Sequence, residues 1–144
     1  MTGALNDQVI FITGAASGIG RATAEAARRA GAHVVGADIG ADAELAELDM
    51  ALPLDVTDAQ GMTDAAAQIM NEFGRIDGLV TCAGISVVGT ATEMPLADWQ
   101  RALDVNLTGT MLAARAVLPH MVAAGRGAIV TLSSIYGMTG GTGN

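Results

Sequence analysis

A glycine-rich segment at residues 13–20 has a composition suited to binding phosphate groups. It follows an apolar, β-branched run and precedes an Ala-rich run with helical period. Glycine lets the backbone turn tightly and approach a ligand, and the free N–H groups at the start of a helix favour negative charge. An ordinary start of a helix can carry the same glycines. The strand and helix on either side favour a dinucleotide site, made by Gly14, Ser17, Gly18, Ile19 and Gly20.

An acidic residue, Asp38, ends the second apolar run, near the offset of about 20 residues at which dinucleotide-binding folds recognise a ribose. A carboxylate there accepts hydrogen bonds from both ribose hydroxyls and repels the 2′-phosphate of NADP. Ser17 and Ile39 occupy the places where a basic side chain would meet that phosphate. The sequence therefore predicts NAD as the cofactor. The alternative is that Asp38 is simply an exposed residue at the end of a strand and does not bind a cofactor.

The charged residues and the cysteine argue against several partners and sites. All seven basic residues are arginines, so the chain has no lysine, and its net charge of −8 would repel nucleic acid. The single cysteine, Cys82, cannot form a disulfide within the chain, and His33 and His120 are too far apart for a metal cluster. We expect a cytoplasmic protein without a metal site.

The apolar segments are too short for export or membrane insertion. Residues 1–8 contain Asp7 and no basic residue, and the run Val9–Ile12 that follows is shorter than the core of a signal peptide. The longest apolar stretch, Met111–Ala124, is interrupted by Arg115 and is shorter than the roughly 20 residues of a membrane span. We expect neither export nor a membrane partner.

Short apolar runs alternate with Ala-rich helical segments along a chain of 144 residues. This alternation is typical of a single α/β domain, in which helices cover a parallel sheet. The last stretch, Gly137–Asn144, is rich in glycine and predicts neither a strand nor a helix. The predicted strands are Val9–Thr13, His33–Asp38, Ala51–Val56, Gly78–Cys82 and Ala128–Ser133. The predicted helices are Ile19–Ala30, one from Thr57 or Asp58 to Phe73, and a long one from Pro95 to Ala124, with a brief helix or turn at Ala41–Leu48.

The whole chain resembles the short-chain dehydrogenase/reductase family. The glycine segment matches the family pattern Thr-Gly-x-x-x-Gly-x-Gly. The resemblance implies a Rossmann-type, doubly wound parallel sheet with strand order 3-2-1-4-5. It also implies that Asp55 and Val56 hold the adenine of the cofactor, and that Ala83 and Gly84 form the next cofactor motif.

This second motif departs from the family pattern. The family has Asn-Asn-Ala-Gly, whereas Thr81 and Cys82 precede Ala83 here. The family asparagines help to hold the sheet together, so the change bears on stability more than on chemistry. We interpret Cys82 as a small buried residue and not as a nucleophile, because nothing near it in sequence would lower its pKa.

The same resemblance implies two catalytic residues. Asn106 matches an asparagine whose backbone carbonyl holds a water molecule in a proton relay; a side-chain hydrogen bond to the next segment is the alternative. Ser134 matches the serine that hydrogen-bonds the substrate oxygen. The family tyrosine and lysine come later, and Tyr136 is too close to Ser134 to be that tyrosine. We therefore expect a chain that is truncated before the Tyr-x-x-x-Lys motif.

We interpret residues 1–144 as the NAD-binding part of an oxidoreductase that moves hydride between nicotinamide and a secondary alcohol or ketone. Without the tyrosine and lysine, this chain alone is expected to be inactive. The resemblance further implies a homo-oligomer, either a dimer or a tetramer. Two alternatives stay open: a non-catalytic NAD-binding or interaction protein derived from such an enzyme, and an enzyme whose other half is a separate chain.

Overall fold

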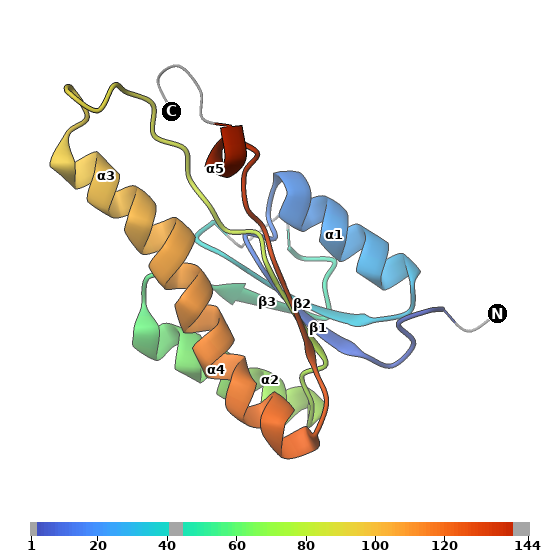
Figure 1. Ribbon diagram of the computed structural model, residues 1–144. Coiled ribbons are helices and arrows are strands. Elements are labelled where there is room, and N and C mark those ends of the chain that lie inside the picture. The colour runs from blue at the N-terminus through green and yellow to red at the C-terminus, as the bar shows by residue number, and fades with distance from the viewer. Residues whose placement is uncertain (1–2, 41–44, 140–144) are drawn as a thin grey trace.

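One parallel sheet of five strands forms the centre of the protein (Figure 1). The computed structural model describes residues 3–40 and 45–139. The strand order is β3-β2-β1-β4-β5, and every neighbouring pair is parallel, as predicted. The strands are β1 (Val9–Thr13), β2 (His33–Asp38), β3 (Met50–Pro53), β4 (Gly78–Thr81) and β5 (Ala128–Thr131).

Helices cover the two faces of this sheet (Figure 1). Helix α1 lies on one face, and α2 and α4 lie on the other. No helix in the described ranges is long and apolar enough to cross a bilayer. The helices are α1 (Gly18–Arg29), α2 (Ala59–Phe73), α3 (Leu96–Leu103), α4 (Gly109–Ala124) and the short α5 (Tyr136–Thr139), with a π-helical turn η1 (Asp104–Thr108) between α3 and α4.

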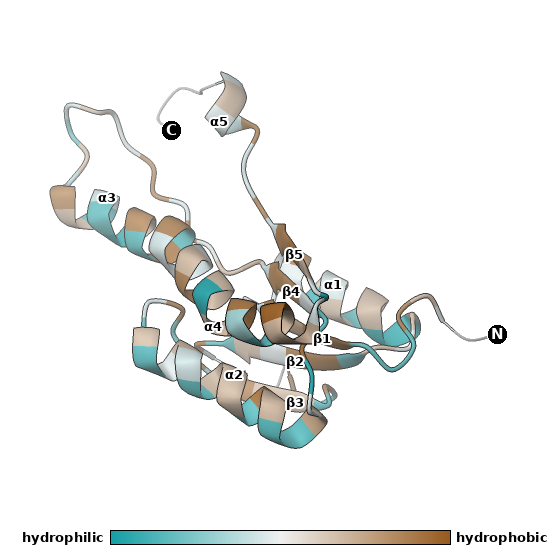
Figure 2. Ribbon diagram, turned by 60° about the horizontal axis from the view of Figure 1, so that its bottom comes forward, coloured by the Kyte–Doolittle hydropathy of each residue, from teal (hydrophilic) through white to brown (hydrophobic). Residues whose placement is uncertain are grey.

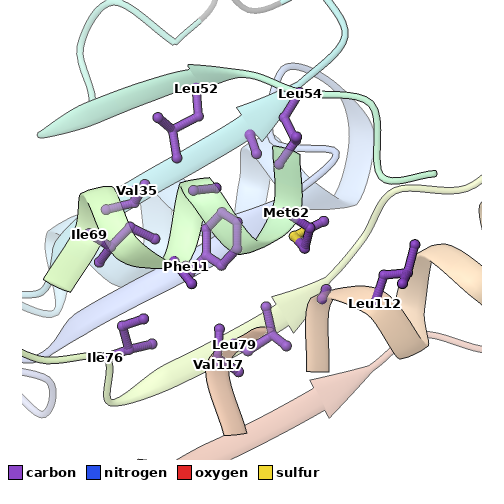
Figure 3. Packing of buried hydrophobic residues seen from close by; sticks show 14 of the residues in the cluster. Phe11, Val35, Leu52, Leu54, Met62, Ile69, Ile76, Leu79, Leu112 and Val117 are labelled. Carbon is purple, nitrogen blue, oxygen red and sulfur yellow. The ribbon is translucent and has the colours of Figure 1, made fainter. Parts of the chain in front are cut away.

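Alternate residues of the strands enter two separate apolar clusters, because successive side chains of a strand point to opposite faces. Phe11 of β1 packs with α2 and α4 on one face, where Met62, Ile69 and Val117 are also fully buried (Figure 3). Ile12 faces α1 on the other side, where small alanines bring the helix close to the sheet. Burying each large side chain stabilises the fold by about 1.5–3 kcal/mol.

Both ends of α2 follow from its sequence. The carboxylate of Asp58 accepts hydrogen bonds from the amides of Gln60 and Gly61, each at 3.0 Å, and so caps the first turn. Gly74 ends the helix with φ of 71°, a left-handed conformation that favours glycine. Of the two residues predicted to begin this helix, Thr57 and Asp58, it is Asp58 that caps it, and the predicted end at Phe73 is confirmed.

Three strands end earlier than predicted: β4 by one residue, at Thr81 and not at Cys82, and β3 and β5 by more. β3 ends at Pro53 and not at Val56, because the amide of Leu54 makes the last bond to β2, at the Asp38 carbonyl, and the chain then turns away. β5 ends at Thr131 and not at Ser133, because its partner strand β4 ends at the registered residue Thr81. The apolar pattern continues past the last hydrogen-bonded pair in both cases.

Two helical predictions also need correction. The segment Pro95–Ala124 is not one regular helix, because the π turn η1 interrupts it: the amide of Gly109 bonds to the carbonyl of Asp104, five residues back. Within Gly137–Asn144, residues 137–139 belong to α5, and residues 140–144 lie outside the described chain. In Ala41–Leu48, residues 45–47 form a turn, and residues 41–44 lie outside the described chain.

Candidate cofactor and active site

The glycine segment forms the turn between β1 and α1, at the carboxyl edge of the sheet. Gly14 and Gly18 have φ of 67° and 52°. A Cβ atom on Gly14 would lie 2.5 Å from the amide nitrogen of Ala83, and one on Gly20 would overlap the carbonyl of Gly14. These glycines are therefore needed for the left-handed backbone and for the close contact between β1, α1 and β4.

The first turn of α1 is open to a ligand. Ser17 precedes the helix with an extended backbone, and among the described residues its side chain makes no capping hydrogen bond. Apart from its chain neighbours and the backbone of the same helix, no described residue lies within 4 Å of the place where a Cβ on Gly18 would be. Uncapped amides beside free space at a helix N-terminus, at the end of a parallel strand, are suited to a phosphate group.

Asp38 ends β2 beside this turn and is half-buried. Its Oδ2 atom accepts a hydrogen bond from the amide of Ala16 at 3.1 Å. One carboxylate oxygen thus fixes the glycine turn, and the carboxylate as a whole lines the pocket in front of it.

All of the residues predicted to bind the cofactor line one pocket of about 350 Å³. Asp55 accepts hydrogen bonds from the Thr57 amide at 2.9 Å and from the Thr57 hydroxyl at 2.8 Å, which hold its carboxylate in place. Side chains that the motifs did not identify supply much of the apolar wall. The predicted residues in this lining are Gly14, Ser17, Gly18, Ile19, Gly20, Asp38, Asp55, Val56, Ala83 and Gly84, and the residues missed are Ile39, Leu54, Cys82, Ile85 and Val105.

The segment after β4 is tied to β1 by two hydrogen bonds. The Cys82 amide donates to the Thr13 carbonyl at 3.1 Å, and the Ala83 amide donates to the Thr13 hydroxyl at 3.4 Å. Cys82 is half-buried and not fully buried as predicted. This burial raises the pKa of its thiol, although a hydrogen bond with Thr23 partly opposes the effect. A thiol with a raised pKa is a poor nucleophile at neutral pH, in agreement with a structural role for Cys82.

A second pocket, of about 580 Å³, adjoins the first and shares the wall formed by residues 82–85. Both predicted catalytic residues, Ser134 and Asn106, line it. Ser134 follows β5 and is exposed, and its Oγ atom accepts a hydrogen bond from the Tyr136 amide at 3.2 Å. The hydroxyl hydrogen of Ser134 therefore remains able to donate to a ligand oxygen.

The Asn106 side chain is hydrogen-bonded to the segment that follows β4. Its Oδ1 atom accepts from the Ile85 amide at 2.8 Å, and its Nδ2 atom donates to the Ile85 carbonyl at 2.9 Å. The alternative reading of this residue, a side-chain bond to another segment, is thus what the structure contains. The backbone carbonyl of Asn106, the group that the family resemblance places in a proton relay, accepts a hydrogen bond from the Thr110 hydroxyl at 2.9 Å.

Thr81 and Thr110 are further polar residues of the second pocket that the motifs did not identify as ligand-binding. Thr81 is 4 % exposed, and within residues 3–40 and 45–139 its hydroxyl has no hydrogen-bond partner. The available signal was weak, because threonine is common in strands and the helical pattern treats Thr110 as an ordinary position.

The chain is similar in sequence to dehydrogenases of one family. The sequence profile described as short chain dehydrogenase matches residues 8–144. The 3-alpha-(or 20-beta)-hydroxysteroid dehydrogenase of Mycobacterium tuberculosis is 41% identical over 146 residues, which cover 97% of this chain and 56% of that protein. The NAD-dependent glycerol dehydrogenase of Listeria innocua is 35% identical over 136 residues, covering 90% of this chain and 54% of that protein. The chain thus spans about half the length of these relatives.

A solved structure shares the fold. The aldohexose dehydrogenase of Thermoplasma acidophilum, in ligand-free form, superposes with a TM-score of 0.86 and 35% sequence identity over 93% of this chain and 52% of that one. The predicted Rossmann-type sheet is confirmed. Because the profile covers nearly the whole chain and the relatives agree with it, the chain belongs to the short chain dehydrogenase family.

Proposed function

We propose that the two adjoining pockets bind NAD and a secondary alcohol or ketone, and that the chain is the cofactor-binding part of an NAD-dependent dehydrogenase. One observation carries this proposal: the glycine turn, Asp38 and Asp55 line a pocket that adjoins the pocket lined by Ser134. Support comes from relatives named as a hydroxysteroid dehydrogenase and an NAD-dependent glycerol dehydrogenase.

The lining residues fit the parts of a dinucleotide. The open amides at the start of α1 are suited to the pyrophosphate, and Asp38 is suited to the hydroxyls of the adenosine ribose. The side chain of Asp55 and the backbone of Val56 would hold the adenine. A negative charge at Asp38 disfavours the 2′-phosphate of NADP, so NAD is the preferred cofactor.

Ser134 would contact the substrate oxygen. When NAD is bound it supplies the hydride acceptor, and the chain's own task is then to hold the substrate oxygen as its charge changes. The Tyr136 amide fixes the Ser134 oxygen, which leaves the hydroxyl hydrogen free to donate to that oxygen. The sequence contains no lysine, so a Tyr–Lys pair for proton transfer would have to come from outside residues 1–144.

The protein at its full natural length allows a direct test. Replacing Ser134 with alanine should lower kcat by roughly 10²–10³-fold, about 3 kcal/mol, because one donor to the developing oxyanion is lost. The NAD affinity should stay the same, because Ser134 does not line the first pocket. Steady-state oxidation of a secondary alcohol and calorimetric titration with NAD measure the two effects.

Ser133→Ala is the matched control. Ser133 lines the same pocket one residue earlier and is equally exposed, so its loss should change kcat little. A Ser134→Ala variant with normal kcat would refute the assignment.

We further propose that the protein is a cytoplasmic homo-oligomer that binds neither nucleic acid nor membranes. The negative net charge supports the first exclusion. Large apolar side chains are exposed on α4, with Val122 at 75% and Leu118 at 43%, which supports a protein–protein interface there.

A further inference from the structure

The Thr110 hydroxyl, on the first turn of α4, lies at the pocket of Ser134 and has no part in the proposed reaction so far. Thr110 lines this pocket together with Asn106 and Ser134. Its Oγ1 atom donates to the Asn106 carbonyl at 2.9 Å. Thr110 does not line the pocket of the glycine turn. Its contribution can therefore be separated from cofactor binding.

The side-chain oxygen of Asn106 already accepts a hydrogen bond, so the backbone carbonyl is the better acceptor for a new partner in the pocket. The side-chain amide is held by Ile85 through both its oxygen and its nitrogen. A carbonyl oxygen can accept more than one hydrogen bond, so the bond from Thr110 does not by itself exclude a further donor.

The helix is distorted at this carbonyl. Asn106 lies inside η1, where backbone pairing shifts from four to five residues, as the Gly109–Asp104 bond shows. Such single π turns occur frequently at functional sites. Because the backbone pairing is irregular here, a side-chain donor contributes more to the direction of the carbonyl than it would in a regular helix.

The lining of this pocket includes a buried polar group that does not stabilise the fold. Thr81, the last residue of β4 and part of the same lining, contributes a buried hydroxyl with no partner in the described part of the chain. Burying an unpaired hydroxyl costs stability, so the floor of the pocket is more polar than a site shaped for core stability alone.

We propose that Thr110 is a positioning residue for proton transfer: its hydroxyl fixes the Asn106 carbonyl so that this carbonyl accepts a hydrogen bond from a water molecule in the pocket. The inference rests on the proposed function, because the water would carry the proton released when an alcohol is oxidised. Thr110 itself touches neither the cofactor nor the reacting atoms.

The test uses the full-length protein and compares Thr110→Val with Thr63→Val. Thr63 makes the same kind of bond in α2, from its hydroxyl to the Ala59 carbonyl at 3.0 Å, and it lies outside both pockets. Both variants lose one hydroxyl-to-carbonyl bond of a helix. Only the Thr110 variant should affect the reaction.

We expect Thr110→Val to lower kcat for alcohol oxidation roughly three- to tenfold, the effect of one neutral hydrogen bond on a rate. The rising limb of the kcat–pH profile should move to higher pH, because the proton leaves less readily. NAD affinity should not change. Thr110→Ser should restore both the rate and the profile, and Thr63→Val should leave both as in the parent protein.

Three outcomes would overturn the inference: an unchanged kcat and pH profile in Thr110→Val, an equal loss in Thr63→Val, or a Thr110→Ser variant as impaired as Thr110→Val. If Thr110→Val does not fold, Thr110→Ala is compared with Thr63→Ala in the same way. A parent protein that binds NAD and oxidises alcohols while Thr110→Val behaves normally refutes this inference alone, whereas a parent protein without such activity refutes the proposed function as well.

Discussion

Three threonines occupy registered positions on neighbouring strands but have different surroundings. Thr13 pairs with Thr81, and Thr81 pairs with Thr131, across β1, β4 and β5. The Thr13 hydroxyl accepts a bond from the Ala83 amide, whereas the buried Thr81 hydroxyl has no partner in the described residues. A buried hydroxyl without a partner costs roughly 1–3 kcal/mol of stability. The Thr13 hydroxyl therefore stabilises the fold, whereas the Thr81 hydroxyl destabilises it.

Replacing each of two threonines by the isosteric valine tests this difference. We expect Thr81→Val to raise the free energy of unfolding by about 1 kcal/mol, because it removes an unpaired hydroxyl. Thr13→Val should lower it by about 1 kcal/mol, because the Ala83 amide loses its acceptor. Urea denaturation measures both changes. A less stable Thr81→Val variant would mean that this hydroxyl has a partner.

The site residues could be predicted from the sequence only where a motif fixes their identity. The turn at Gly14–Gly20 and Asp38 combine a residue type with a spacing that dinucleotide binding requires. Apolar wall residues such as Ile85 and Val105 could not be predicted, because they follow the same hydrophobic pattern as the core. Thr110 was missed because its partner is a backbone carbonyl, which no side-chain pattern reveals.

At the level of the elements, two aspartates join the amino ends of the strands. Asp77 precedes β4, accepts from the Val9 amide of β1 at 2.9 Å, and pairs with Arg75 and Arg126. Asp49, before β3, accepts in the same way from the Val34 amide of β2 at 2.8 Å. Each carboxylate thus holds the start of a neighbouring strand.

These contacts make the stability depend on pH. Burial alone would raise the pKa of Asp77, but the hydrogen bonds from Arg75 and the Val9 amide, with the charge of Arg126, lower it below the ordinary value. A lowered pKa in the folded state adds stability above the pKa of an unfolded Asp, about 3.9, and this stability is lost as the pH falls through the folded-state value.

Asp77→Asn should therefore have two effects. At neutral pH we expect a loss of about 2 kcal/mol in the free energy of unfolding, because hydrogen bonds to a charged group are lost. Below about pH 4 the stability of the variant should fall less steeply than that of the parent protein. Denaturation curves at several pH values measure both effects. Asp64→Asn, on the exposed side of α2, is the control, and an equal loss in that variant would argue against a special role of Asp77.

The starts of most elements could be predicted, and several ends could not. The start of β1 and both ends of α2 follow from local sequence signals, such as the Asp58 cap and Gly74. The end of β3 depends on where β2 stops offering partners, and Val56 stays buried after it has left the sheet. The π turn could not be predicted, because a single shifted turn barely changes the apolar period of a long helix.

At the scale of the whole molecule, the edge of the sheet at β5 is exposed. Within the described chain β5 pairs with β4 alone, and Val130 is 55% exposed. Figure 2 shows β5 as an apolar strand at this edge. The groove between β5 and α1 has a volume of about 340 Å³ and a largely apolar lining that includes Ile10 and Val130.

We expect the 144-residue chain on its own to self-associate, because an unpaired apolar strand edge offers its backbone and side chains to another copy. Light scattering measures the mass in solution. Val130→Lys should reduce the association, since a charge on an edge strand opposes pairing. A chain that remains a monodisperse monomer as its concentration increases would argue against self-association through the edge of β5.

The central claim is that the pocket between the glycine turn and Asp38 binds NAD, and calorimetric titration with NAD and NADP tests it most directly. We predict that the protein binds NAD more tightly than NADP by a factor on the order of ten or more, because the Asp38 carboxylate repels the added phosphate. Asp38→Ala should reduce this preference. Equal affinity of the parent protein for the two cofactors, or no binding of either, would contradict the account.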